Sequence, residues 1–156
     1  MDIIKLIVCI AACEGIGGLG ALFTAPAIPV WYRKLKKPSF TPPSRAFAPV
    51  WTVLYLLMGF SVFLIWREGL QYSQVLSAFI VFWFQLILNL LWSVFFFGLR
   101  SLLGGMIIIV LLWIAILICI LLFFDISPLA GGLLIPYIIW VSIAASINFQ
   151  LWRINK

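Results

Sequence analysis

Five long apolar runs divide this chain, and they constrain its fold more than any other feature. The runs cover residues 3–25, 46–66, 75–98, 102–124 and 129–152. Each exceeds the roughly 20 residues that a helix needs to cross a bilayer. Apolar residues make up 66% of the chain and charged residues 9%, so a soluble domain would expose extensive apolar surface. The sequence predicts an all-α membrane protein, a single domain over 1–156 with five transmembrane helices surrounded by lipid.

The first run has a second interpretation as a cleavable signal peptide. Lys5 lies near its start, and Ala25-Pro26-Ala27 resembles a small-residue cleavage site. Glu14 interrupts the apolar stretch, however, and the run is long enough to span a bilayer. We expect an uncleaved first helix.

The segment 26–45 differs from the rest of the chain because prolines and basic residues are concentrated in it. Since proline interrupts regular helix, we expect an ordered polar loop over these residues, with the first helix ending at 25. Ser44 is a candidate N-cap for the second helix, and Ser127-Pro128 has the pattern of an N-cap followed by proline at the first helical position. The five prolines of the segment are Pro26, Pro29, Pro38, Pro42 and Pro43.

The distribution of Lys and Arg predicts the orientation of the chain. Eight of the ten basic residues fall in the first loop, the third loop and the C-terminal segment, on one side of a five-span protein. By the positive-inside rule that side is cytoplasmic, which places the N-terminus outside. With few residues outside the membrane and no clear cleavable signal, we expect a multi-pass protein of a prokaryotic cell membrane.

The residue inventory excludes several chemistries. Histidine is absent and acidic residues number four, so imidazole-ligated haem, His/Cys zinc sites and histidine general bases are excluded. The three cysteines lie in apolar runs and are interpreted as small buried residues. We expect no metal site and no required cofactor. The net charge of +6 is assigned to membrane topology and anionic headgroups, with no nucleic-acid partner.

Polar and aromatic residues recur at helical spacing in two runs, which predicts two inward-facing stripes. Amides within a membrane either bond between helices or line a cavity, and spacing alone leaves both open. Glu14, among glycines, has the same two interpretations: bonded to a neighbouring helix, or facing a ligand or water. The stripes comprise Gln85, Asn89, Trp92, Ser93 and Phe96 in the third run and Pro136, Trp140, Ala144 and Asn148 in the fifth.

Several motifs combine aromatic residues, prolines and amides at fixed spacing. The first pair is Trp31-Tyr32-x-x-Leu35-x-Lys37-Pro38-Ser39-Phe40-x-Pro42-Pro43 and Phe47-x-Pro49-Val50-Trp51-x-x-Leu54-Tyr55-x-x-Met58-Gly59. Later runs contain Gln85-Leu-x-Leu-Asn89-x-x-Trp92-Ser93-x-x-Phe96-Phe97, Pro136-Tyr137-x-x-Trp140 and Asn148 with Trp152-Arg153-x-Asn155. These motifs are similar to those of the TspO/MBR family, the translocator proteins or peripheral-type benzodiazepine receptors. The resemblance covers the chain from the first to the last helix.

The resemblance implies a five-helix bundle, usually a homodimer, with a pocket beneath the first loop for porphyrins such as protoporphyrin IX and haem, sterols and synthetic ligands. Carried over residue by residue, its ligand contacts fall on Tyr32, Trp51, Asn89, Trp92, Trp140 and Ala144, with Pro42 and Phe47 near the loop entrance. Animal-type members have a tyrosine in a sterol-recognition stretch of the last helix. Phe149 stands at that position here, which argues against high-affinity sterol binding.

On this basis the predicted function is a membrane receptor or sensor that binds tetrapyrroles, with transport or oxidative-stress signalling as further roles. Trp51, Trp92 and Trp140 would stack on the macrocycle, and Asn89 would orient it. The anionic propionates would lie toward the basic first loop, although topology and headgroup binding alone also account for its charge. The loop residues in question are Arg33, Lys34, Lys36 and Lys37.

Two other classes of function remain open. Some bacterial relatives are associated with light-dependent breakdown of protoporphyrin IX, for which the resemblance points to Trp51 and Trp140. The chain offers no acid, base or nucleophile triad, so such a reaction would be the ligand's own photochemistry. In the third alternative the protein is a structural scaffold of the bilayer, whose buried Trp and Asn only pack helices.

Overall fold

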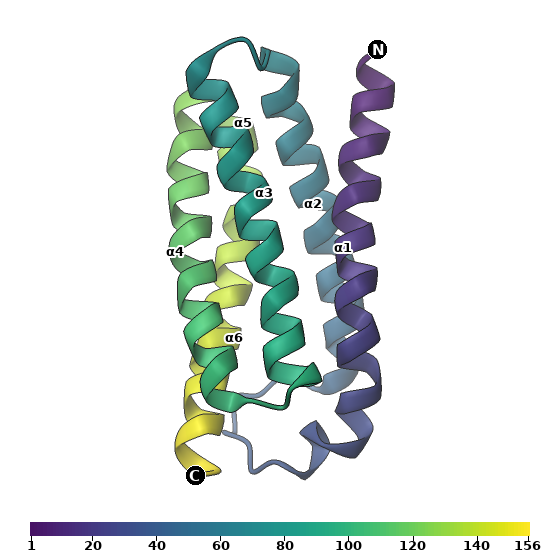
Figure 1. The fold of residues 1–156 in the computed structure, drawn as a ribbon, viewed down its shortest axis with the longest axis vertical. Coiled ribbons are helices and arrows are strands. Elements are labelled where there is room, and N and C mark those ends of the chain that lie inside the picture. Colours follow the sequence, from purple (N-terminus) through teal and green to yellow (C-terminus); the bar gives the residue numbers. More distant parts are fainter.

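The protein is a bundle of long helices packed side by side, with its two termini at opposite ends (Figure 1). The computed structural model describes residues 1–156, and five of its helical segments are long and apolar enough to cross a membrane. The predicted all-α class is therefore confirmed. In chain order the elements are α1 (Asp2–Val30), η1 (Tyr32–Lys34), η2 (Ser44–Ala46), α2 (Phe47–Glu68), α3 (Ser73–Ser93), η3 (Val94–Gly98), α4 (Leu102–Ile126), α5 (Pro128–Leu133) and α6 (Ile135–Ile154).

Large apolar side chains cover the outside of the bundle, as expected for a surface that contacts lipid. Ile80 and Leu121, for example, are each 58% exposed. The helices differ in how far the bundle encloses them: within one apolar 18-residue stretch of each span, 50% of the residues are buried in Ser44–Glu68 but only 17% in α1. Helix α1 is thus the least enclosed wall of the protein.

Helix α1 continues five residues beyond its predicted end, so the predicted loop boundary at residue 26 is too early. Pro26 and Pro29 lie inside the helix. Each removes one backbone N–H, but a transmembrane helix tolerates this because nearby groups satisfy the freed carbonyls. The helix ends at Trp31, whose N–H donates to the carbonyl of Ala27.

Two of the predicted helix starts have different outcomes. Ser127 caps α5 with its hydroxyl, which accepts from the backbone N–H of Ala130, and Pro128 follows at the first helical position. Ser44 does not cap α2, because a short 3₁₀ turn over Ser44–Ala46 precedes that helix. Ala46 occupies the cap position without a side-chain hydrogen bond.

The fifth membrane span is built from two helices, α5 and α6, that meet at Leu134. Pro136 cannot donate to a carbonyl one turn earlier, which ends the regular pattern of α5. The hydroxyl of Ser61 donates to the carbonyl of Ala130 at 2.7 Å and ties this region to α2. Pro136, predicted to face inward, is exposed, and its neighbour Tyr137 is buried instead.

A π-helical turn over Val94–Gly98 ends the third span at the same end of the bundle as the first loop (Figure 1). The N–H of Leu99 donates to the carbonyl of Val94 at 2.8 Å. The wider turn brings Phe96 and Phe97 into the core, with ring centroids 4.7 Å apart. Such turns frequently occur at functional sites.

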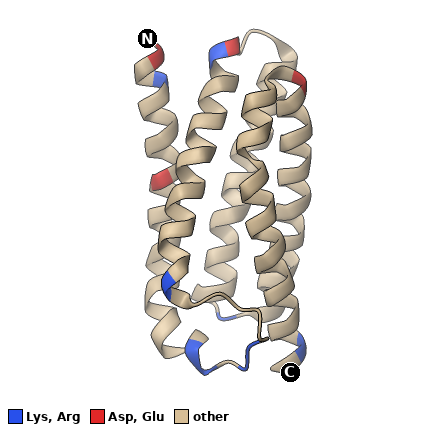
Figure 2. Ribbon diagram, turned by 180° about the vertical axis from the view of Figure 1, so that it is seen from behind, with Lys and Arg blue, Asp and Glu red and all other residues tan.

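Charged residues separate between the two ends of the bundle (Figure 2). The first loop, the third loop and the C-terminus meet at one end, which brings together the eight basic residues counted above. The start of α1 and the ends of α2 and α4 lie at the opposite end (Figure 1), and these segments carry Asp2, Lys5, Arg67, Glu68 and Asp125. The structure thus joins the charges on which the predicted orientation depends, and the orientation itself remains a prediction.

Candidate ligand-binding site

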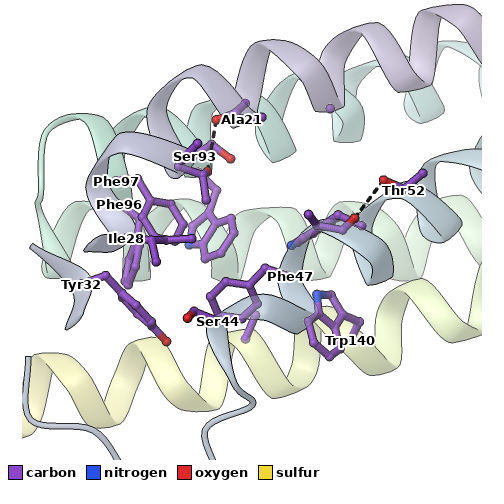
Figure 3. Close-up of a pocket in the computed structure, with 18 of the residues that line it drawn as sticks. Ala21, Ile28, Tyr32, Ser44, Phe47, Thr52, Ser93, Phe96, Phe97 and Trp140 are labelled. Carbon is purple, nitrogen blue, oxygen red and sulfur yellow. Dashed lines mark hydrogen bonds between the residues drawn. The ribbon is translucent and has the colours of Figure 1, made fainter. Parts of the chain in front are cut away.

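A cavity of about 350 Å³ lies inside the bundle, at the end closed by the first loop (Figure 3). Its walls come from α1, α2, α6 and the end of α3, with Tyr32, Pro42 and Ser44 contributed by the loop. Pockets for small molecules are typically of this size or larger and are mostly apolar. The aromatic residues that line it are Tyr32, Phe47, Trp51, Tyr55, Trp92, Phe96, Phe97 and Trp140.

Trp51 occupies the centre of the aromatic wall. Its ring stacks on Tyr55 with centroids 5.6 Å apart and planes 29° from parallel. The ring centroid of Trp92, on α3, lies 6.3 Å from that of Trp51. Tyr137, on α6, makes an edge-to-face contact with Trp51, with ring centroids 6.2 Å apart. Trp140 reaches the same cavity from α6, and its ring packs edge-to-face with that of Phe47, with centroids 6.4 Å apart. Three helices therefore present aromatic faces to one space.

The opposite wall, on α1, is made mostly of small residues. A Cβ atom added at Gly17 would lie 2.5 Å from the Tyr55 ring, and one at Gly20 would lie 3.2 Å from the Ser93 hydroxyl. Glycine at position 17 thus permits the close approach of α1 to α2, and the contact of Gly20 with α3 is tight. Ala21 and Ala25 continue the wall toward the loop. Between Glu14 and Ile28 this wall carries no large side chain, which leaves space for the cavity.

The polar groups of the lining are mostly used within the protein. The hydroxyls of Thr24 and Thr52 donate to carbonyls of their own helices. The indole N–H of Trp92 donates to Asn148, whose amide in turn donates to the carbonyl of Leu102 at 2.8 Å. The indole N–H groups of Trp51 and Trp140 make no hydrogen bond with the protein, so both can serve a ligand.

Asn89 lies behind the cavity wall rather than on it. It is 1% exposed. Its carbonyl accepts from the Tyr55 hydroxyl at 2.7 Å, and its amide donates to the Tyr137 hydroxyl at 2.8 Å. Tyr137 then donates to the carbonyl of Gln85 at 2.8 Å. The first stripe thus joins three helices through hydrogen bonds, and it faces inward as predicted.

The basic residues of the first loop surround the end of the cavity without lining it. Arg33, Lys34 and Lys36 are exposed. The ammonium of Lys37 donates to the carbonyls of Arg33 and Leu35 and lies 4.7 Å from the centre of the Tyr32 ring. Desolvation and the nearby Arg33 lower the pKa of Lys37. Burial raises the pKa of Tyr32 to about 12, so its phenol is neutral at physiological pH.

Most of the residues predicted to bind ligand surround this one cavity. Asn89 and the four basic residues Arg33, Lys34, Lys36 and Lys37 do not line it. Their proposed contacts with a ligand stay predictions. The residues that line it are Tyr32, Pro42, Phe47, Trp51, Trp92, Trp140 and Ala144.

Sequence reasoning did not identify the roles of Tyr55 and Tyr137. Both were visible in the motifs, but nothing in their spacing shows that their hydroxyls meet the amide of Asn89 across helices. Glu14 was left with two interpretations, and the structure places it on the cavity lining.

Comparison with known proteins agrees with the motifs and with the helix arrangement. The model of the TspO/MBR family matches residues 9–153. The chain belongs to this family. The tryptophan-rich protein TspO of Chlorobaculum tepidum is 40% identical over 154 residues, covering 99% of this chain and 98% of the relative. The protein of the same name from Archaeoglobus fulgidus is 42% identical over 120 residues, 77% of each chain.

Animal members of the TspO/MBR family are similar over a shorter region. The translocator protein of Bos taurus is 37% identical over 86 residues, which cover 54% of this chain and 51% of the relative. The bacterial relative from Chlorobaculum tepidum is thus similar along almost the whole length of this multi-pass membrane protein, and the archaeal one over about three quarters of it.

Proposed function

We propose that this protein is a membrane receptor or sensor that binds tetrapyrroles such as protoporphyrin IX in the aromatic cavity. The observation that carries the proposal is the convergence of Trp51, Trp92 and Trp140 on one apolar space inside the bundle. A flat macrocycle gains free energy by burying its apolar faces, and aromatic rings add favourable stacking.

Hydrogen bonding would orient the ligand in this cavity. The unused indole N–H groups of Trp51 and Trp140 can donate to acceptors on a ligand. Asn89 has both ends of its amide bonded to tyrosines, so we assign it to holding Tyr55 in the wall. Its effect on a ligand is therefore indirect, through the position of the ring of Tyr55 beside Trp51.

The cavity would widen to admit a macrocycle. Its volume of about 350 Å³ is at the lower end of the range for small-molecule sites. The wall with the smallest side chains is α1, where glycine and alanine predominate among the residues that face the cavity. Helix α1 is also the least enclosed of the five spans, so we expect the cavity to widen on this side.

Titration of protoporphyrin IX into the detergent-solubilised protein, followed by tryptophan and porphyrin fluorescence, tests the proposal. We expect saturable binding, weakened by about tenfold or more in the double variant Trp51→Phe, Trp140→Phe, because two indole donors and part of the stacking area are lost. A matched control is Trp66→Phe, Trp152→Phe, two tryptophans outside the cavity lining. Equal affinities in all three proteins would reject the aromatic cavity as the binding site.

The propionate contacts require a separate experiment. We expect that replacing Arg33, Lys34, Lys36 and Lys37 by Gln weakens protoporphyrin IX but not its uncharged dimethyl ester, because only the free acid carries anionic groups. An equal loss for both ligands would mean that the loop's charge serves topology and headgroup binding alone.

A second candidate function is light-dependent oxidative breakdown of protoporphyrin IX. The observation in its favour is that Trp51 and Trp140 both line the cavity, with Trp51 stacked on Tyr55. Illumination of the purified complex, with and without oxygen, separates catalysis from binding. New absorption bands that depend on oxygen and on both tryptophans would favour the enzyme, whereas unchanged spectra would leave a receptor.

The proposal also includes a homodimer in a prokaryotic cell membrane. The exposed apolar surface of the bundle suits either lipid or a second copy of the chain. Sedimentation of the protein in detergent, corrected for bound detergent, distinguishes the monomer from the dimer.

A further inference from the structure

Glu14 is the one acidic residue of the cavity lining, and no Lys or Arg lines the cavity with it. One of its carboxylate oxygens, Oε1, is buried without a hydrogen-bond partner. Ionisable groups are costly within a membrane and are normally paired or turned toward a water-filled or ligand-filled space. A partner for this oxygen must therefore come from outside the chain.

The hydroxyl groups of three lining residues are not available to Glu14. The Tyr55 hydroxyl is directed to Asn89, 2.7 Å away. The hydroxyls of Thr24 and Thr52 donate to Gly20 and Ala48. The indole N–H groups of Trp51 and Trp140 do not bond Glu14 either, so no side chain of the cavity satisfies Oε1.

Two glycines leave Glu14 uncovered by the next turn of α1. Side chains of a helix lean toward its N-terminus, so the residues three and four positions later would cover Glu14. These are Gly17 and Gly18, and an added Cβ at Gly18 would meet nothing within 4 Å. Both glycines line the cavity beside Glu14. No side chain of α1 thus blocks Glu14, and a ligand would reach the buried Oε1 once the cavity widens on this side.

Glu14 also defines the end of the cavity far from the loop. It precedes Ile28, another lining residue, by 14 positions, or about 21 Å at the rise of an α-helix. The opposite end is lined by Tyr32, Pro42 and Ser44, and the first loop to which they belong carries five basic residues. The site is therefore acidic at depth, with positive charge at the end closed by the loop.

We propose that Glu14 is a specificity-determining residue that selects ligands with an N–H donor, above all a protonated amine, at the end that enters the bundle first. This inference rests on the proposed ligand-binding cavity and adds the chemical class that the cavity prefers. A flat aromatic ligand with an amine at its leading end pairs with the carboxylate, while its apolar body contacts Trp51 and Trp92. A ligand without a donor leaves Oε1 unpaired, at a cost in affinity.

Three pyrenes that differ at one substituent provide the test: 1-pyrenemethylamine, 1-pyrenemethanol and 1-methylpyrene. Each is titrated into the full chain in phosphatidylcholine nanodiscs at pH 7, with energy transfer from tryptophan to pyrene as the readout and empty nanodiscs as the blank. Hydrogen bonds to charged groups predict that wild type binds the amine about tenfold or more tightly than the methyl compound, with the alcohol between them.

Glu14→Gln removes the charge with little change in shape, and the quantity compared is the amine-to-methyl ratio of affinities within each variant. We expect the ratio to fall to about twofold or less in Glu14→Gln, since a neutral amide oxygen accepts more weakly. Glu68→Gln, an acidic residue outside the cavity, is the matched control and keeps the wild-type ratio.

The outcomes separate this inference from the proposed function. A wild-type ratio near one, or a high ratio that persists in Glu14→Gln, rejects the role of Glu14 while porphyrin binding still stands. Saturable protoporphyrin IX binding without any pyrene binding rejects it as well. If neither porphyrin nor pyrenes bind, the cavity is not a ligand site and both proposals fail. If Glu14→Gln does not fold, Glu14→Ser replaces it in the same comparison, and a wild-type ratio near one rejects the role of Glu14 without any variant.

Discussion

At the scale of single residues, Asn89 illustrates how a polar group in a membrane bundle acquires its role. Two tyrosines from different helices use both ends of its amide, so the residue holds the back of the cavity wall in place. The nearby Gln85 is also buried, and its amide nitrogen has no partner. The buried amides therefore contribute to the site by fixing Tyr55 and Tyr137.

Asn89→Ala is expected to lower the stability of the protein by about 1–2 kcal/mol, because it leaves the Tyr55 hydroxyl without its acceptor in an apolar interior. The midpoint of thermal unfolding in detergent measures the loss. Ser77→Ala, which removes an exposed hydroxyl bonded to its own helix, is the control and should change little. Equal midpoints for the two variants would contradict the structural role of the amide.

At the scale of elements, the contact between α1 and α2 depends on a glycine on α2. A Cβ atom at Gly59 would lie 2.7 Å from the Cα of Ile10. The backbone of α1 therefore approaches the backbone of α2 closely at the position where α2 has no side chain. Small residues permit the close helix packing that stabilises bundles in lipid. The position of α1, and with it one wall of the cavity, is set here.

Gly59→Ala should therefore destabilise the bundle by about 1–3 kcal/mol, since one of the two helices must move outward. Gly15→Ala is a matched glycine control on α1, where the added Cβ meets nothing within 4 Å. It should be neutral or stabilise the helix by about 0.5–1 kcal/mol. Resistance to unfolding by sodium dodecyl sulfate compares the two, and a smaller loss for Gly59→Ala than for Gly15→Ala would refute the close crossing.

The first loop is fixed to the C-terminal end of α6 by a reciprocal pair of hydrogen bonds. The backbone N–H of Lys36 donates to Asn155 at 3.1 Å, and the Asn155 amide donates back to the carbonyl of Lys36 at 3.0 Å. Residues far apart in the chain thus close the basic end of the bundle over the cavity.

Asn155→Ala removes both bonds, each worth about 1 kcal/mol, so hydrogen exchange at the Lys36 amide should be about tenfold faster or more. Mass spectrometry of peptides from the loop measures the exchange, with Lys156→Ala as the neighbouring control. Unchanged exchange in Asn155→Ala would show that other contacts hold the loop.

At the scale of the whole molecule, the separation of charge between the two ends predicts orientation. Eight basic residues meet at the loop end, whereas the other end has two basic and three acidic residues. The positive-inside rule counts Lys and Arg, and the imbalance favours a cytoplasmic loop end. In this orientation the loop that closes the cavity faces the cytoplasm, and Glu14 lies toward the middle of the membrane.

Fusions to a cytoplasmic fluorescent protein and to a periplasmic phosphatase test this orientation in a bacterial host. We expect fluorescence from the C-terminal fusion and phosphatase activity from the N-terminal side. Fluorescence from an N-terminal fusion, without fluorescence from the C-terminal fusion, would show that the orientation is the reverse of the predicted one.

The sequence by itself determined the class of fold, the approximate bounds of five spans, the inward direction of the Gln85–Phe96 stripe and the aromatic character of the site. These follow from local patterns, namely run length, helical period and the positions of basic residues. The motifs also indicated the family, and with it most of the residues that surround the cavity.

Only the tertiary structure decided how polar partners are distributed. It placed Asn89 behind the wall, left Oε1 of Glu14 without a donor, extended α1 through Pro26 and Pro29, and turned Pro136 outward. Each result depends on which side chain a neighbouring helix presents at the same depth. Helical spacing fixes the direction of a residue relative to its own axis, but a hydrogen bond depends on distances of a few tenths of an ångström between helices, which packing alone sets.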